Sequence, residues 1–313
     1  LAALLEFCFH NERALARLGS EGWPTQFANR VRHWWRANTP RGSRRNIAAH
    51  YDLGNAFYSR WLDSTMNYSS AIYAGDETLE IAQVRKLARI NTLLELSGRE
   101  SVLEIGCGWG ALAEATLRAD AAHYVGITLS REQLAFARAR LDRAGFAAKA
   151  EFRFEDYRHV EGQFDRIASI EMLEAVGERY WETYCGVLRQ RLAPGGVAVL
   201  QAITIAPDRY DVYRRRPDFI QRYIFPGGML PTAQILLHER ERAGLMLEHI
   251  ESFAQSYART LHEWRRRFLD AWSDIAPLGF DARFRRMWEY YLAYCEIGFR
   301  FGAIDVSLIK LRG

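Results

Sequence analysis

The chain has 313 residues, of which 49% are hydrophobic and 13% aromatic, and its formal net charge is +4. This composition can fill a large core and excludes a disordered protein. No apolar run approaches the roughly 20 residues that span a bilayer, which argues against a transmembrane helix. The four cysteines, Cys8, Cys107, Cys185 and Cys295, show no metal-ligand spacing and suit a reducing cytoplasm.

The first 98 residues carry helical patterns and many aromatic side chains. Residues 1–46 predict a helical arm that ends in the basic linker "NTPRGSRRN". Residue 1 is Leu rather than Met, so we expect the start of the chain to be trimmed. Residues 47–98 include the helical stretch "TLEIAQVRKLARINTLLEL" (78–96).

Strand and helix patterns alternate from residue 101 onward. We expect strands at 101–106, 123–130, 150–157, 164–170 and 197–205, and helices up to 118 and at 131–145 and 179–192. A Pro-Gly-Gly turn precedes the fifth strand, residues 206–246 are helical and irregular, and 258–300 are mostly helical. The last strands are "MLEHIESFAQS" (246–256) and "AIDVSLIKL" (303–311). Such alternation predicts an α/β fold around a parallel sheet.

Three glycines, Gly106, Gly108 and Gly110, stand where the first of these strands turns into a helix. Glycines there let the backbone approach a ligand closely, and a helix N-terminus offers unpaired N–H groups. Glu104 precedes the loop, and the G-x-G-x-G spacing differs from the dinucleotide pattern G-x-G-x-x-G. No acidic residue ends the second strand, where an NAD ribose would require one. The loop therefore predicts a bound cofactor other than NAD.

Arginines are clustered at three places, in "RGSRR" (41–45), "YRRRP" (213–217) and "WRRRF" (264–268). These clusters fit either solvated helix faces or a surface that docks on anionic phosphate. The sequence leaves both interpretations open.

Several long segments, in the same order, are similar to the cyclopropane-fatty-acid synthase family, which includes the mycolic acid cyclopropane synthases. They are "NIAAHYDLGNAFYSRWLDSTMNYSSAIY" (46–73), "VGITLSREQLAFARARL" (125–141), "FDRIASIEMLEAVGERYWETY" (164–184), "YIFPGGMLP" (223–231), "SYARTLHEWRRRF" (256–268) and "WEYYLAYCEIGFR" (288–300). The glycine loop and the Pro-Gly-Gly turn also resemble those of class I S-adenosylmethionine-dependent methyltransferases. The resemblance covers residues from about 46 to the C-terminus.

This resemblance implies a Rossmann-like class I methyltransferase fold, with a seven-stranded, mostly parallel sheet, helices on both faces and a helical lid. It implies an N-terminal helical arm and linker over 1–46 and a methyltransferase domain over 47–313. The lid elements are expected at about 47–98, 206–246 and 258–300.

The family's S-adenosylmethionine site, carried over position by position, implies a set of cofactor-binding residues. The set is Tyr68, Ser69, Glu104, Gly106, Gly108, Gly110, Thr128, Leu129, Ser130, Gln133, Asp156 and Tyr157. In the segment "EDY" (155–157) the register is good to a residue or two.

The family also holds a bicarbonate ion beside the transferred methyl group. The matching positions here are Ser70, Glu174, Gln201, Ile203 and Tyr257. Ser70 replaces a cysteine of the family and Gln201 replaces a histidine, so Gln201 can position an anion but cannot relay a proton. Glu174 should accept the proton of bicarbonate or be protonated itself.

Two further residues are candidates for catalysis. Cys295 aligns with a cysteine that the family is often described as using, although alkene methylation requires no thiolate. His50 in "AHYD" is either catalytic or structural.

The implied function is methyl transfer from S-adenosylmethionine to the double bond of an unsaturated fatty acyl chain, in a phospholipid. We expect a cyclopropane ring as the product. A methyl or methylene branch is the other outcome, since "LQAITI" (200–205) resembles a subgroup with branched products. The expected partners are this acyl substrate and, transiently, an anionic membrane surface; a homodimer stays open and no nucleic acid is expected. We place the protein in the cytoplasm, peripherally at the inner face of the membrane. The alternatives are a methyltransferase for a small amine or phosphobase, and a non-catalytic cofactor-binding protein that docks on membranes.

Overall fold

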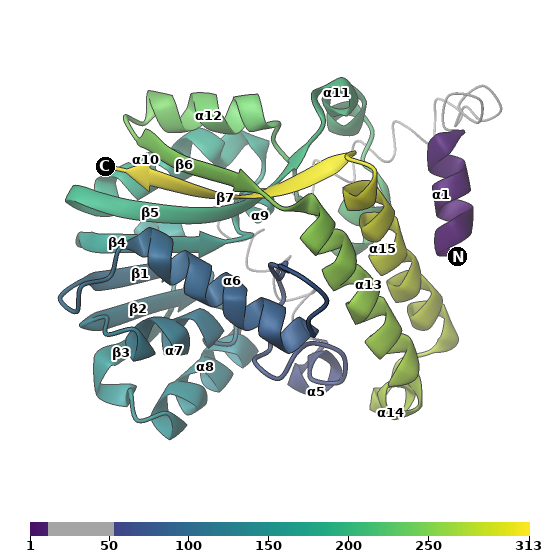
Figure 1. Ribbon diagram of the computed structural model, residues 1–313, viewed down its shortest axis with the longest axis horizontal. Helices are drawn as coiled ribbons and strands as arrows, with labels where there is room; N and C mark the ends of the chain where they lie inside the picture. Colours follow the sequence, from purple (N-terminus) through teal and green to yellow (C-terminus); the bar gives the residue numbers. More distant parts are fainter. Residues whose placement is uncertain (12–52) are drawn as a thin grey trace.

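A computed structural model describes residues 1–11 and 53–313 (Figure 1). His50 and the basic cluster at 41–45 lie outside the described residues, so the structure gives no position for either.

One seven-stranded sheet forms the centre of the protein, in the order β3-β2-β1-β4-β5-β7-β6. Its strands are β1 (Ser101–Ile105), β2 (His123–Thr128), β3 (Ala150–Phe154), β4 (Phe164–Ile170), β5 (Leu192–Ile205), β6 (Met246–Ser252) and β7 (Ile304–Arg312). Strands β1 to β5 pair in parallel, whereas β7 runs antiparallel to both β5 and β6. This confirms the predicted seven-stranded, mostly parallel sheet.

Helices cover both faces of the sheet (Figure 1). They are α6 (Leu79–Leu94), α7 (Ala111–Arg118) and α8 (Arg131–Arg143) on one face, and α9 (Leu173–Val176), α10 (Trp181–Arg191) and α12 (Ala233–Arg242) on the other. Successive residues of β1 point to opposite faces, so Val102 packs with the α7 and α8 side and Leu103 with the α10 side. The N-cap side chains of Thr78, Ser130 and Thr232 accept from backbone N–H groups and fix where α6, α8 and α12 begin.

A second core of aromatic side chains lies beyond the sheet, where α13 (Ala254–Asp270) packs on α15 (Ala282–Arg300). The short helices α5 (Asn55–Tyr58) and α14 (Trp272–Ile275) lie beside this pair (Figure 1). Trp61, Trp264 and Trp288 are fully buried here and meet edge to face. Helix α1 (Ala2–His10) packs against α15, and Phe9 stacks on Phe301.

The structure narrows the expected lid. Helix α6, which belongs to the first expected lid element (47–98), covers the sheet and is not part of a lid. Its Leu87 and Ile90 pack with Val197 and Val199 of β5. Of residues 206–246, α12 packs on α10, so only α11 (Pro207–Arg215) and the π-helical turn Ile220–Ile224 remain away from the sheet faces. The third element, 258–300, forms the α13 and α15 pair.

The Pro-Gly-Gly turn lies inside β5 rather than before it. Leu192 pairs with Phe164, and the next pair along β4 joins Arg166 to Val197, so the residues between loop out as a bulge. Within residues 1–11 and 53–313, each helix is too short or too polar to cross a bilayer.

Candidate functional site

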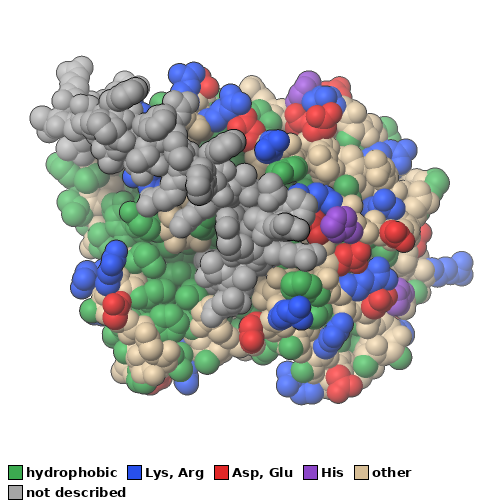
Figure 2. Space-filling model, turned by 180° about the vertical axis from the view of Figure 1, so that it is seen from behind, with side chains coloured by type: hydrophobic (Ala, Val, Ile, Leu, Met, Phe, Trp, Pro, Cys, Tyr) green, Lys and Arg blue, Asp and Glu red, His purple; other side chains and the backbone are tan. Residues whose placement is uncertain are grey.

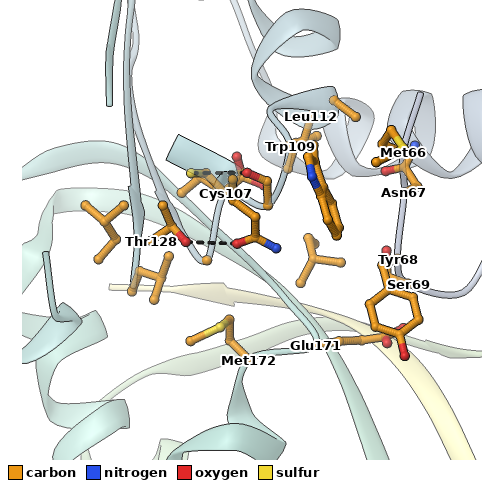
Figure 3. Close-up of a pocket in the computed structure, with 18 of the residues that line it drawn as sticks. Met66, Asn67, Tyr68, Ser69, Cys107, Trp109, Leu112, Thr128, Glu171 and Met172 are labelled. Carbon is orange, nitrogen blue, oxygen red and sulfur yellow. Dashed lines mark hydrogen bonds between the residues drawn. The ribbon is translucent and has the colours of Figure 1, made fainter. Parts of the chain in front are cut away.

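A cavity opens at the carboxyl ends of β1, β2 and β4, the edge where open α/β sheets bind ligands (Figure 3). It encloses about 910 Å³ of space, part of it open to solvent. Among the residues expected to bind the cofactor, those that line it are Tyr68, Ser69, Glu104, Gly106, Gly108, Thr128, Leu129, Gln133 and Tyr157. The structure therefore brings most of this set together around one cavity.

The glycine loop lines one side of the cavity, and its three glycines differ in what a side chain would meet there. Gly106 has φ +85°, and a Cβ there would lie 2.4 Å from Cγ of Met172. Gly108 has φ +49°, and a Cβ there would meet no atom within 4 Å. Gly110, with φ +80°, lies against Ala137 of α8 and does not line the cavity. Gly108 thus leaves space for a ligand, whereas Gly110 serves helix packing, contrary to our expectation.

The segment after β2 is held by its own side chains. The Thr128 hydroxyl donates to Oε1 of Gln133 at 2.9 Å, and the Ser130 hydroxyl accepts from the Gln133 N–H at 3.3 Å (Figure 3). Leu129, Thr128 and Gln133 face the cavity, but Ser130 does not, because it caps α8. The prediction of a cofactor contact is therefore not met at Ser130.

The turn after β3 presents other residues than expected. Glu155 and Tyr157 line the cavity, whereas Asp156 is buried away from it. Asp156 accepts from Arg158 at 2.6 Å and caps the next turn, and this pairing keeps the pKa of Asp156 low despite its burial. At this turn Glu155 and Tyr157, but not Asp156, therefore face the space expected for the cofactor.

A buried charged pair lies beneath the loop. Lys86 of α6 donates to Ser69 Oγ at 2.7 Å and to Asn67 Oδ1 at 3.3 Å. Burial lowers the pKa of Lys86 to about 8, although the nearby carboxylates of Glu171, Asp63 and Glu104 oppose this. Burial raises the pKa of Glu104 to about 7, against the hydrogen bond from Tyr124 at 2.7 Å. Both groups can change charge near neutral pH.

Three of the five residues expected to hold an anion, Ser70, Gln201 and Tyr257, do come together, but around a carboxylate that the sequence analysis missed. Oε1 of Glu171 accepts from the Ser70 N–H at 2.8 Å and from Nε2 of Gln201 at 2.7 Å. Oε2 of Glu171 accepts from the Tyr257 hydroxyl at 2.7 Å. We call Ser70, Glu171, Gln201 and Tyr257 the cradle. Of these four residues only Glu171 lines the cavity.

Glu174 lies outside the cradle. Its Oε1 accepts from the N–H of Ile203, and its Oε2 is buried without a partner among the described residues. Removal from water, and then the neighbouring charge of Glu171, raises the pKa of Glu174 to about 8. At neutral pH Glu174 is therefore mostly protonated, as one of our two alternatives required, but it does not contact the other anion-holding side chains.

Cys295 lies on α15 and does not line the cavity. Burial, and then Asp218, raises the pKa of its thiol, so it stays protonated at neutral pH. Its surroundings are those of a packed apolar helix, which opposes a catalytic role.

Glu171 and Lys86 could have been found from the sequence. Glu171 follows β4 directly, and acidic residues at the carboxyl end of a parallel strand face the ligand edge of the sheet. Lys86 falls on the apolar face of α6, between Gln83 and Ile90, where a lysine is unusual.

Comparisons with known proteins agree with this geometry. The family model described as mycolic acid cyclopropane synthetase matches residues 38–309. The tuberculostearic acid methyltransferase UfaA1 of Mycobacterium tuberculosis is 42% identical over 88% of this chain and 69% of its own length. The cyclopropane-fatty-acyl-phospholipid synthase of Escherichia coli is 38% identical over 83% of this chain and 65% of its own length.

A solved structure has the same fold. The mycolic acid cyclopropane synthase CmaA1, complexed with SAH and CTAB, superposes with a TM-score of 0.81 and 27% identity. The match covers 86% of this chain and 98% of that chain.

Proposed function

The chain belongs to the mycolic acid cyclopropane synthetase family of S-adenosylmethionine-dependent methyltransferases, and from this premise we propose the reaction that it catalyses. It transfers a methyl group to the double bond of an unsaturated fatty acyl chain carried by a phospholipid. The observation that carries this proposal is a single cavity with the glycine loop at one side and the carboxylate of Glu171 at the other.

S-adenosylmethionine, once bound, supplies an electrophilic methyl group on a sulfonium. Gly106 and Gly108 would take its methionine and ribose parts, because a ligand can approach closely where Gly108 has no side chain. Thr128, Leu129 and Gln133 would lie by the ribose and adenine.

The aromatic core suits the other reactant. An isolated double bond is a poor nucleophile and becomes a carbocation when it is methylated, so the site must exclude water and stabilise positive charge. Tyr68 lines the cavity, its ring lies 5.3 Å from that of Trp264, and its hydroxyl is 2.9 Å from that of Tyr291. Aromatic faces stabilise a desolvated cation by about 2 kcal/mol.

The two alternatives have less support. A methyltransferase for a small amine would have no use for a buried oxyanion cradle beside an aromatic core. Glu171 faces the cavity from a left-handed backbone position, with φ +53°. A non-catalytic membrane-docking protein would have no use for a carboxylate held there.

Contact with an anionic membrane is a separate proposal and rests on fewer arginines than expected. Arg265, Arg266 and Arg267 pair with carboxylates, as does Arg214. On the face in Figure 2 both signs of charge are interspersed. Arg215 and Arg216 are exposed, with no ion pair among the described residues. Binding to anionic vesicles that weakens with salt would therefore be reduced by the variant R215E.

The function is tested by lipid mass spectrometry. The purified protein is incubated with S-adenosylmethionine and phospholipids that carry one defined double bond. We expect an acyl chain heavier by one methylene unit, and fragmentation distinguishes a ring from a branch. Phosphoethanolamine and small amines serve as competing substrates. Methylation of those amines with no change in any acyl chain would contradict the proposal.

A further inference from the structure

We propose that the carboxylate of Glu171 is the catalytic base of this reaction and takes, within the chain, the place expected for a free bicarbonate ion. This inference rests on the proposed function, because it assigns a step in the same reaction. It also corrects our expectation of bicarbonate, which the residues brought together here do not fit.

The donors that would hold a free oxyanion are already used. The Ser70 N–H, the Gln201 amide and the Tyr257 hydroxyl, each at 2.7 to 2.8 Å, all point to the two oxygens of Glu171. Planar oxyanions need such directed donors. A bicarbonate ion would have to displace the carboxylate and then lie beside it, where like charges repel.

The backbone of Glu171 has an unusual conformation for a residue with a side chain. Glu171 has φ +53°, in the left-handed region where glycine carries no penalty and other residues are uncommon. Strained conformations of this kind concentrate at functional sites. The conformation places the Glu171 carboxylate where the Ser70, Gln201 and Tyr257 donors meet it.

The surroundings of the two neighbouring carboxyls differ. Three donors and the buried ammonium of Lys86 favour the ionised form of Glu171, although burial still raises its pKa above the ordinary value. Glu174 is the protonated partner of the two. Burial keeps the Tyr257 hydroxyl protonated and therefore a donor. Burial thus raises the basicity of Glu171, while three hydrogen bonds favour its carboxylate form, and both features suit a base that abstracts a proton.

Its position also fits. Glu171 is partly exposed, lines the cavity, and extends toward Tyr68 and Ser69 (Figure 3). The next residue, Met172, lies under Gly106 of the cofactor loop, so the carboxylate faces the same space as the loop.

The step balances without an oxidant or reductant. After the double bond has taken the methyl group, a C–H bond of that methyl breaks and its electron pair closes the third bond of a cyclopropane ring. The proton moves to an oxygen of Glu171. If a hydride first shifts between the two former alkene carbons, the same proton loss leaves a methylene branch.

The first test measures anion binding and does not depend on activity. Carbon-13 NMR follows labelled bicarbonate with wild type, E171G and, as a matched control, E161Q, which changes an exposed glutamate. Each protein is saturated with S-adenosylhomocysteine. The variant E171G removes the carboxylate and suits the left-handed backbone, so it should fold. We expect bicarbonate to bind E171G and neither of the others. Equal binding to wild type and E171G would overturn the proposal.

The second test measures turnover on an unsaturated phospholipid in carbonate-free buffer. We expect E171Q, which keeps the shape but cannot accept a proton, to lose about a hundredfold or more in turnover. Bicarbonate should restore turnover to E171G and leave E171Q and wild type unchanged. Wild type that requires bicarbonate, or E171Q with normal turnover, would refute the assignment. If wild type makes no lipid product at all, the proposed function fails, while the binding experiment still decides the role of Glu171.

Discussion

The glycine-loop end of the cavity is shaped by backbone, whereas the cradle is formed by side chains. The loop end takes its shape from the backbone of two short segments, 104–112 and 127–133, which pair directly between β1 and β2. The cradle consists of side chains, and Glu171 meets partners that are 30, 86 and 101 residues away in the chain. A local sequence pattern can therefore specify the first region, whereas the second exists only after the whole sheet and α13 have assembled.

The largest effect should come from Gly106, the loop residue that lies against Met172, the neighbour of Glu171 in the chain. In the variant G106V the new side chain would collide with Met172, and the residue would lose the freedom of φ +85°. Overpacking and left-handed strain together should lower the free energy of unfolding by about 2 to 5 kcal/mol. Urea unfolding measures this. Stability like that of wild type would show that the loop and the Glu171 segment are not mechanically linked.

The variant G108V separates ligand space from packing. A Cβ at Gly108 meets no atom, so the side chain enters the cavity itself, and only the backbone strain at φ +49° costs stability. We expect a loss of about 1 to 2 kcal/mol in stability. Affinity for S-adenosylhomocysteine, measured by calorimetry, should fall by at least tenfold, about 1.4 kcal/mol. Unaltered affinity would mean that the cofactor lies elsewhere.

A third effect, beside the cradle, is a dependence of stability on pH. The folded protein keeps a proton on Glu174 up to a pKa of about 8, whereas the unfolded chain releases it near 4.5. The folded state therefore binds more protons between these values, and stability falls as pH rises through them, by up to about 1.4 kcal/mol per pH unit. E174Q should make this slope shallower by removing the contribution of Glu174, although the raised pKa of Glu104 still contributes up to about pH 7, and the control E161Q should keep the wild-type slope. If the free energy of unfolding of wild type and E174Q fell equally with pH, Glu174 would not carry the proton that the folded state retains.

The contrast also explains what the sequence could predict. The positions of strands and helices along the chain, the glycine loop and the Thr128 to Gln133 segment follow from apolar periodicity, turn chemistry and capping, which are local. The resemblance led us to Glu174, three residues from the carboxylate that the cradle holds. The position of Glu171 directly after β4 marks it as facing the ligand edge, but only long-range pairing decides which of the two carboxyls meets Tyr257.

The same reasoning applies to α6. The resemblance implied a lid over 47–98, yet Leu87 and Ile90 of α6 form an apolar stripe that packs on the sheet. An amphipathic pattern predicts that a helix is covered on one face. It does not say which partner provides the cover.

The position of β7 has a consequence for synthesis on the ribosome. Strand β7 is made after the other six strands, yet it lies between β5 and β6, and within residues 1–11 and 53–313 it is the strand that pairs with β6. While the nascent chain still lacks 304–312, one edge of β5 is unpaired and β6 has no neighbour, and unpaired strand edges invite aggregation. The sheet must therefore close after translation of this last strand. Nascent chains stalled before residue 304 should consequently depend on chaperones that bind exposed strands.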